Sequence, residues 1–307
     1  LLHSLGATAG VQLGHAGAKS ATPPPWVSEE DRRPASQWPI ESVTDEPHAP
    51  GWQRPNALTS SDLEQQLRDW VAAAKRAANA GFDVLEIHAA HGYLLHSFLS
   101  PLSNTRTDEF GGSLRNRMRY PLAVVDAVRA VWPDDRPLLV RLSVVDNSPG
   151  GLTVEDSVEI ACAFACAGVD VIDCSSGGIG SGYSRPIGPG YQVEFAQAVR
   201  AEAHIATMAV GMVVDPHQAD DIVTSGAADL VALGRQALVD PSWPLRACDT
   251  LAPDSTDRYS LLAVQSRSWV AKRDRQLARF HASASAEQPC HEPSDRVATA
   301  PGAEVRS

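Results

Sequence analysis

The sequence has no long hydrophobic run. It contains no stretch of about 18 consecutive apolar residues, the length that a membrane-spanning helix requires. The first residues also lack the basic segment followed by an apolar core that marks a secretory signal peptide. These absences argue against a membrane or secreted protein. Because the chain begins with Leu1 rather than methionine, we expect a further segment upstream.

Cysteine is scarce and follows no regular spacing. The five cysteines form no CxxC pair, so no disulfide framework is predicted. Cys162 and Cys166 lie four residues apart on the face of an expected helix, where buried thiols are the more common case. Unpaired cysteines fit a reducing cytoplasm, which is the location that we expect.

Basic residues are outnumbered by acidic ones. The chain has 26 Lys and Arg against 37 Asp and Glu, a net charge of −11 at pH 7. Nucleic acids and anionic membranes attract proteins with clustered Lys and Arg, so neither is expected as a partner. By contrast, 43% hydrophobic and 21% charged residues are the proportions of a soluble globular protein, and 307 residues can bury a large core.

Short apolar runs of strand length recur along the chain, and helical patterns separate them. Most of these runs are apolar nearly throughout, as strands covered on both faces should be. The six candidate strands are Gly10–Gly14, Val84–Ala89, Leu138–Ser143, Val169–Cys174, Ile205–Val210 and Leu230–Leu233.

The intervening segments carry the signals of helix starts and stops. Residues 59–80 have an apolar stripe, with Ser61 or a neighbour as N-cap and Gly81 as the end. Thr153 opens a capping box, and Asp215 precedes a proline in a first helical turn. Strands and helices that alternate in this way form βαβ units around a parallel sheet. We therefore predict an α/β protein with six such units.

Two regions do not follow this alternation of strands and helices. Residues 18–58 are rich in proline and tryptophan without a clear period, and a loop of that length is usually functional or disordered. Residues 281–307 are rich in Ala, Ser, Pro and Glu, a composition that predicts disorder. We expect one domain over residues 1–250 and a divergent C-terminal extension over residues 251–307.

The carboxyl ends of the predicted strands carry the candidate site residues, because in a βα barrel these ends face the active site. They supply amide, imidazole, guanidinium and glycine groups: Gln12, His15, His88, His91, Arg141, Ser175 to Gly178, Gly211, Gly234 and Arg235. The set lacks the carboxylate cluster of a metal hydrolase and any Ser/His/Asp arrangement. Glycines beside Arg235 suit a phosphate held by backbone N–H groups and one cation.

Several motifs resemble the Old Yellow Enzyme family. Residues 87–104 read IHAAHGYLLHSFLSPLSN, and RTDEFGGS follows at 106–113. QLGHAG at 12–17 resembles the family's third barrel strand, RLS at 141–143 its fifth, and VGM at 210–212 with LGR at 233–235 its seventh and eighth. The HAAH form is similar to the bacterial YqjM-like branch of ene-reductases. The resemblance extends from about residue 8 to residue 250 in order and spacing.

This resemblance implies a (β/α)₈ TIM barrel in which strands 3–8 are present and strands 1 and 2 are missing. It implies bound FMN, with NADPH or NADH as the reductant. Gln12 and Arg141 would hydrogen-bond the isoalloxazine ring, and Gly211, Gly234 and Arg235 would hold the phosphate. No segment matches the family's first strand, and residues after Asp249 diverge, so FMN affinity and a homo-oligomeric state are open.

The same resemblance assigns the catalytic groups. His88 and His91 would donate hydrogen bonds to the oxygen of an enone or a phenolic ligand. These preorganised donors would stabilise the negative charge that develops on this oxygen during the reaction. Tyr93 would give a proton to the α-carbon. Hydride from the reduced flavin would enter the β-carbon, because the flavin carries the redox chemistry.

The sequence favours other roles less for some of these residues and leaves two alternatives for the chain. A metal site at His88 and His91 lacks an acidic third ligand, so no metal is predicted. We expect His96 to be structural or exposed, Lys19 to be solvated, and Arg106 and Asp108 to form a local ion pair. Two further hypotheses for the whole chain are a non-catalytic remnant of such a barrel and the reductase barrel of a larger aryl-CoA flavoenzyme.

Overall fold

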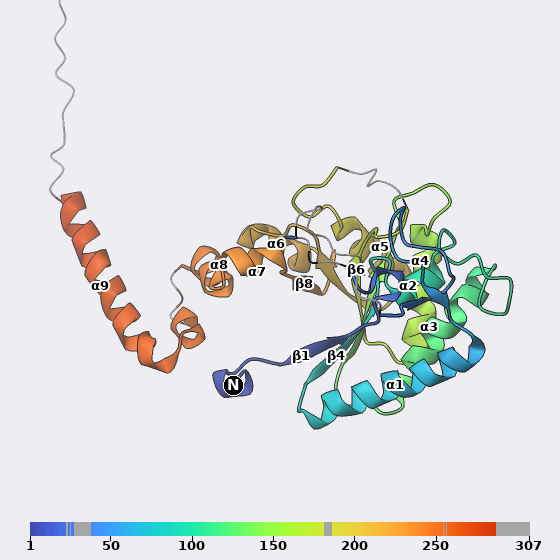
Figure 1. Ribbon diagram of the computed structural model, residues 1–307. Coiled ribbons are helices and arrows are strands. Elements are labelled where there is room, and N and C mark those ends of the chain that lie inside the picture. Colours follow the sequence, from blue (N-terminus) through green and yellow to red (C-terminus); the bar gives the residue numbers. More distant parts are fainter. Residues whose placement is uncertain are drawn as a thin grey trace, which may run out of the picture. The chain divides into compact units, whose positions relative to one another are not determined.

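The computed structural model describes residues 1–22, 24, 26–27, 38–180, 186–253, 255 and 257–286 (Figure 1). The chain divides into two compact units, Leu1–Pro253 and Asp254–Ser307. Part of the proline-rich region, residues 28–37, and residues 287–307 of the expected disordered tail lie outside the described residues.

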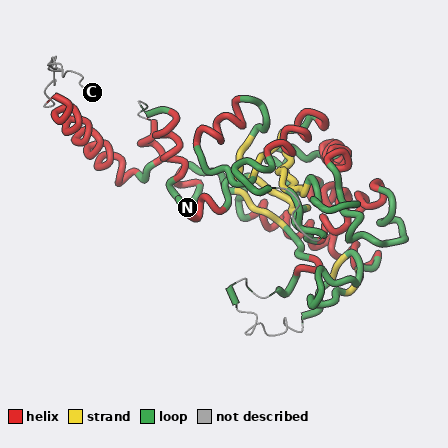
Figure 2. The backbone as a smooth tube through the Cα atoms, turned by 90° about the horizontal axis from the view of Figure 1, so that it is seen from above, coloured by secondary structure: helices red, strands yellow, loops and turns green. Residues whose placement is uncertain are grey.

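The first unit is built on a parallel sheet of six strands, seen in yellow in Figure 2. All six strands coincide with the predicted apolar runs to within two residues at each end. Their order in space is their order in sequence, as consecutive βαβ units require. The strands are β1 (Gly10–Leu13), β4 (Val84–Ala89), β5 (Leu138–Ser143), β6 (Val171–Ser175), β7 (Ala206–Val210) and β8 (Leu230–Ala232).

Local capping fixes the starts of the predicted helices. Helix α1 (Ser60–Asn79) begins at a capping box in which the Thr59 side chain accepts from the Asp62 N–H. Its N-cap is therefore Thr59 rather than Ser61. Helices α4 (Val154–Cys166) and α6 (Pro216–Thr224) begin at Thr153 and Asp215, as predicted.

The other described elements fill the connections. Those of the first unit are η1 (His3–Leu5), η2 (Gly17–Lys19), β2 (Glu41–Ser42), β3 (Asn56–Ala57), α2 (Leu94–Leu99), α3 (Leu114–Arg129), α5 (Val193–Ala203), α7 (Arg235–Val239) and α8 (Trp243–Leu251). The second unit contains η3 (Asp257–Leu261) and α9 (Val264–Ala286). Residues 281–286, where disorder was predicted, are thus helical, which suits their alanines because alanine is the best helix former.

The two faces of the sheet differ in polarity. Leu85 and Ile87 of β4 and Val140 of β5 are fully buried in the core with helices α1, α3, α4 and α5. The alternate positions carry charged groups, among them Glu86 and Arg141, which the prediction of strands apolar on both faces did not include. These polar groups form the face on which the candidate site lies.

Two expectations about thiols and membranes can be compared with the structure. Cys162 is partly buried and Cys166 is exposed, so the prediction of two buried thiols is wrong. Cys166 ends α4, where the helix emerges from the core. No helix within the described residues has both the length and the apolar character needed to cross a bilayer.

Candidate active site

Six of the predicted site residues line one cavity at the carboxyl ends of the strands, whereas the lining does not include Gln12, His15, His88, Tyr93 or Ser176 to Gly178. The cavity has a volume of about 440 Å³. The site residues that line it come from β4 through α7: His91, Arg141, Ser175, Gly211, Gly234 and Arg235. Residues spread over more than 140 positions of sequence, from 91 to 235, thus share one space because the parallel strands deliver them to the same edge.

His88, near the end of β4, and His91, which follows this strand, lie side by side. His88 Nε2 is 3.4 Å from His91 Nδ1, and His91 Nε2 is 2.7 Å from the Ser175 hydroxyl. The Ala90 N–H donates to His88 Nδ1 at 3.1 Å, which leaves the proton of a neutral His88 on Nε2. Tyr93 lies next to this pair, its ring centroid 4.7 Å from that of His88.

Both histidines are neutral at physiological pH. Burial, helped by the positive charge of Arg141, lowers the pKa of His88 to about 4 and that of His91 to about 3. An unfolded histidine has a pKa of about 6.5, so the unfolded chain binds these protons first. The stability that depends on neutral His88 and His91 is therefore present above pH 6.5 and is lost as the pH falls toward 4.

A row of polar side chains crosses the inner face of the sheet below the cavity. Gln12 donates to Glu86 on the neighbouring strand, and Arg141 Nε lies 3.4 Å from an Asp173 oxygen. Asp173 is only 2% exposed. The pKa of Asp173 is raised to about 7, chiefly by burial and also by the nearby Glu86 carboxylate, against the opposing effect of Arg141.

Glu86 and Asp173 are site residues that the sequence interpretation missed. The signal was available, because each is an acid inside a strand whose other residues are mostly apolar. Such a residue in a buried strand needs a partner. The partners, Gln12 and Arg141, come from neighbouring strands, and the parallel pairing aligns Gln12 with Glu86 and Arg141 with Asp173.

The carboxyl group of Asp173 should make stability depend on pH. Its folded pKa exceeds its unfolded value, so its contribution is present below pH 4 and is lost as the pH rises toward 7. Asp173→Asn, which cannot ionise, should therefore gain stability relative to the natural chain between pH 5 and pH 8, by up to about 4 kcal/mol. Urea denaturation at both pH values measures this difference. The exposed Asp220→Asn serves as control, and an Asp173→Asn effect that is equal at pH 5 and pH 8 would contradict the raised pKa.

The far end of the cavity fits a phosphate. Gly211 has φ +129°, a conformation that other residues rarely adopt. A Cβ built at Gly234 would meet nothing within 4 Å, so open space lies in front of this backbone. Exposed Arg235 follows directly at the cavity wall. Arg141, whose Nε lies 3.4 Å from an Asp173 oxygen, also lines the cavity, so that the lining contains two cations, Arg141 and Arg235. These residues fit FMN.

The remaining expectations had mixed outcomes. His96 is fully buried and structural. Arg106 and Asp108 form the predicted ion pair, and Arg106 also donates to the backbone oxygens of Val43 and Leu58. The expectation that Lys19 is solvated is wrong: its Nζ donates to the backbone oxygens of His91 and Gly178. The described residues contain no group of three or more acids, histidines or cysteines that could hold a metal ion.

The fold and the family match together define the class of this protein, an oxidoreductase with its candidate site at the carboxyl edge of a parallel βα sheet. Residues 2–253 match the NADH:flavin oxidoreductase / NADH oxidase family, and the chain belongs to it. The Old Yellow Enzyme resemblance is thereby confirmed, and the family's cofactor is FMN.

Particular relatives are NADPH dehydrogenases. That of Geobacillus sp. (strain WCH70) is 45% identical over 251 residues, covering 82% of this chain and 69% of that enzyme. That of Bacillus subtilis (strain 168) is 42% identical over 246 residues, covering 80% and 68%.

Solved structures of reductases are also similar. Morphinone reductase in complex with tetrahydroNAD has a TM-score of 0.64 at 26% identity, covering 85% of this chain and 71% of that one. A 2-naphthoyl-CoA reductase complex has a TM-score of 0.70 at 25% identity, covering 81% of this chain. This chain spans only 39% of that reductase.

Proposed function

We propose that the protein is an FMN-dependent NAD(P)H oxidoreductase of the ene-reductase type, which reduces the C=C bond of an α,β-unsaturated carbonyl compound. The observation that carries this proposal is the pair of neutral histidines, His88 and His91, beside Arg141 at one end of a cavity that has Gly211 and Arg235 at its other end. Family membership and the NADPH dehydrogenase relatives support it.

Arg141 and Gln12 would orient the flavin ring, and Gly211, Gly234 and Arg235 would hold the FMN phosphate. The chemistry that FMN supplies when bound is transfer of a hydride taken from NADPH or NADH. Arg141 would place a positive charge beside the flavin ring, which carries a negative charge when it is reduced. Each charge-assisted hydrogen bond of this kind contributes roughly 1.5–3 kcal/mol.

His88 and His91 would bind the carbonyl oxygen of the substrate. Because both imidazoles are neutral, each can give one N–H as a hydrogen bond without releasing a proton. Preorganised donors stabilise the negative charge that develops on this oxygen. Tyr93, which lies against His88, would give its hydroxyl proton to the α-carbon.

We further propose that β1 and β4 to β8 are strands 3–8 of an eight-stranded (β/α)₈ barrel. Within the described residues, β1 pairs only with β4 and β8 only with β7. Unpaired edges promote association, and two further strands would satisfy both. The alignment with the Geobacillus enzyme leaves 31% of that enzyme unmatched, which is room for them.

Turnover of a simple enone tests the proposed function. The purified chain, supplied with FMN and NADPH, should reduce 2-cyclohexenone to cyclohexanone in stoichiometric amounts, as measured by gas chromatography. A chain that binds no FMN would support the hypothesis of a non-catalytic remnant.

The similarity to 2-naphthoyl-CoA reductase favours a second candidate, the reductase barrel of a larger aryl-CoA flavoenzyme. Reduction of an aryl-CoA ester but not of 2-cyclohexenone would select it.

A further inference from the structure

The backbone that carries His91 is held in an unusual turn. His91 has φ +59° and Gly92 has φ +72°, so two successive residues adopt the left-handed conformation. This conformation costs free energy for a residue with a side chain and persists only when its surroundings enforce it. Gly92 is required for a second reason, because a Cβ there would lie 2.3 Å from the Gly178 oxygen.

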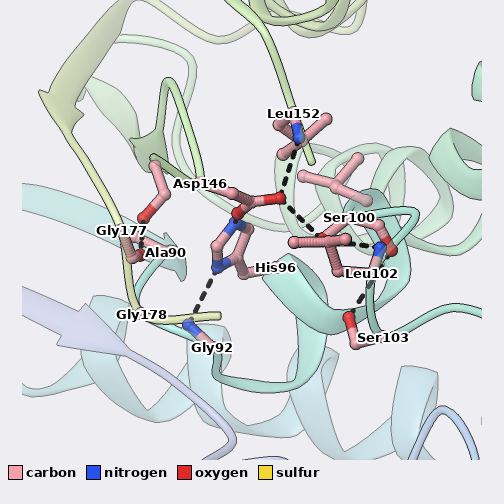
Figure 3. A network of polar contacts seen from close by, with 12 residues as sticks. Ala90, Gly92, His96, Ser100, Leu102, Ser103, Asp146, Leu152, Gly177 and Gly178 are labelled. Carbon is pink, nitrogen blue, oxygen red and sulfur yellow. Dashed lines mark hydrogen bonds and ion pairs between the residues drawn. The ribbon is translucent and has the colours of Figure 1, made fainter. Parts of the chain in front are cut away.

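Side chains bond each polar backbone atom at the centre of this turn. The His91 N–H donates to the Ser143 hydroxyl at 3.0 Å, and the His91 oxygen accepts from Lys19 Nζ at 2.6 Å. The Gly92 N–H donates to His96 Nδ1 at 2.8 Å (Figure 3). Ser143 lies at the end of β5 and Lys19 at the end of η2. His96 lies on α2, immediately after the turn.

His96 is itself oriented by a buried acid. Its Nε2 lies 2.9 Å from Asp146 Oδ1, and both side chains are 0% exposed. Within the described residues this 2.9 Å contact is the only polar contact found for either atom, and neither has a regular hydrogen bond to a further group. Since Nδ1 accepts from Gly92, the proton of the neutral ring is on Nε2 and faces the carboxylate. Asp146 therefore selects the tautomer of His96 that can hold the turn.

The other oxygen of Asp146 is also occupied. Its Oδ2 accepts from the Ser100 hydroxyl at 2.7 Å and from the Leu152 N–H at 2.8 Å, as Figure 3 shows. Burial alone would raise the pKa of Asp146, but the bonds from His96, Leu152 and Ser100 together hold it below its usual value. A charged acceptor thus joins the loop after β5 to α2 and, through His96, to the His91 turn.

We propose that Asp146 and His96 are positioning residues, which aim the His91 imidazole at the substrate oxygen by fixing the left-handed turn at His91 and Gly92. Neither residue touches the substrate. This inference rests on the proposed function, because it assigns His91 the role of a donor to that oxygen. A shift of about 1 Å in a catalytic group can lower a rate about 100-fold. Asp146 and His96 can therefore control the reaction although neither contacts the substrate.

The variant Asp146→Asn tests whether Asp146 and His96 position His91. Asp146 accepts from three donors, whereas an asparagine amide has a single acceptor oxygen and turns its NH₂ group toward the others. We expect the rate of enone reduction to fall about tenfold or more, while oxidation of the reduced enzyme by ferricyanide, which needs no hydrogen bond from His91, stays within about twofold. Ser157→Ala is the matched control, because it removes a buried hydrogen bond to Val144 near the same loop without touching the turn.

The outcomes separate this inference from the proposed function. If the natural chain does not reduce enones, the proposed function fails. If the natural chain reduces them and Asp146→Asn does so equally well, or if the rates of enone reduction and ferricyanide oxidation change in Asp146→Asn no differently from those in Ser157→Ala, the positioning role of Asp146 and His96 is refuted. A second measurement needs no variant: ¹⁵N NMR of histidine-labelled natural chain should show His96 with its proton on Nε2. A proton on Nδ1, or on both nitrogens at pH 7, would overturn the inference even if Asp146→Asn does not fold.

Discussion

Replacing His88 or His91 with alanine should slow enone reduction about 100- to 1000-fold, because loss of one preorganised donor raises such a barrier by about 2.7–4 kcal/mol. Binding of a phenol, followed by its charge-transfer absorbance with the flavin, should weaken as well. Reduction of the flavin by NADPH should suffer less, since hydride delivery to the flavin does not require charge stabilisation on the enone oxygen. Stopped-flow measurement of the two half-reactions separates these effects.

A surface histidine provides the control for this experiment. His217 is exposed on α6 and does not line the cavity, so His217→Ala should leave both half-reactions unchanged. If the double variant of His88 and His91 reduces 2-cyclohexenone at the natural rate and still binds the phenol, these residues do not bind the substrate oxygen. Because their pKa values lie near 4 and 3, their protonation should not affect the rate between pH 6 and pH 8.

Arg235→Gln should lower the affinity for FMN about 10- to 100-fold, the equivalent of one charge-assisted hydrogen bond of roughly 1.5–3 kcal/mol. Riboflavin, which has no phosphate, should bind both forms equally well. Fluorescence titration with the two flavins measures this difference. Arg246→Gln is the control, since Arg246 pairs with Asp240 and lies outside the cavity lining. Equal losses of affinity for FMN and riboflavin would show that Arg235 does not contact the phosphate.

The strands and helix starts were predictable because their causes are local. An apolar run such as Leu138–Ser143 must be buried, and Thr153 with Asp156 closes a capping box within one turn of α4. The position of a residue at a strand end was equally predictable, which is why His91, Arg141 and Arg235 share the predicted cavity. Their roles toward a flavin remain a prediction that rests on the family motif.

The contacts that were missed are long-range. Lys19 donates to oxygens 72 and 159 positions away, so its burial depends on how the loops after β1, β4 and β6 meet. The spacing of residues in the sequence does not predict which loops contact one another in the folded chain. The same holds for Asp146, whose partner His96 lies 50 positions earlier on α2. The composition of 281–286 misled for another reason, because alanine and serine occur both in disordered tails and in the last turns of a helix such as α9.

The most direct test of the central claim, an FMN site in the cavity of His91, Arg141 and Arg235, is titration of the purified 307-residue chain with FMN. Flavin fluorescence and equilibrium dialysis should give saturable binding at one site per chain, and the bound flavin should be reduced by NADPH and reoxidised by 2-cyclohexenone. A folded chain, verified by circular dichroism, that shows no saturable binding of FMN would contradict the claim.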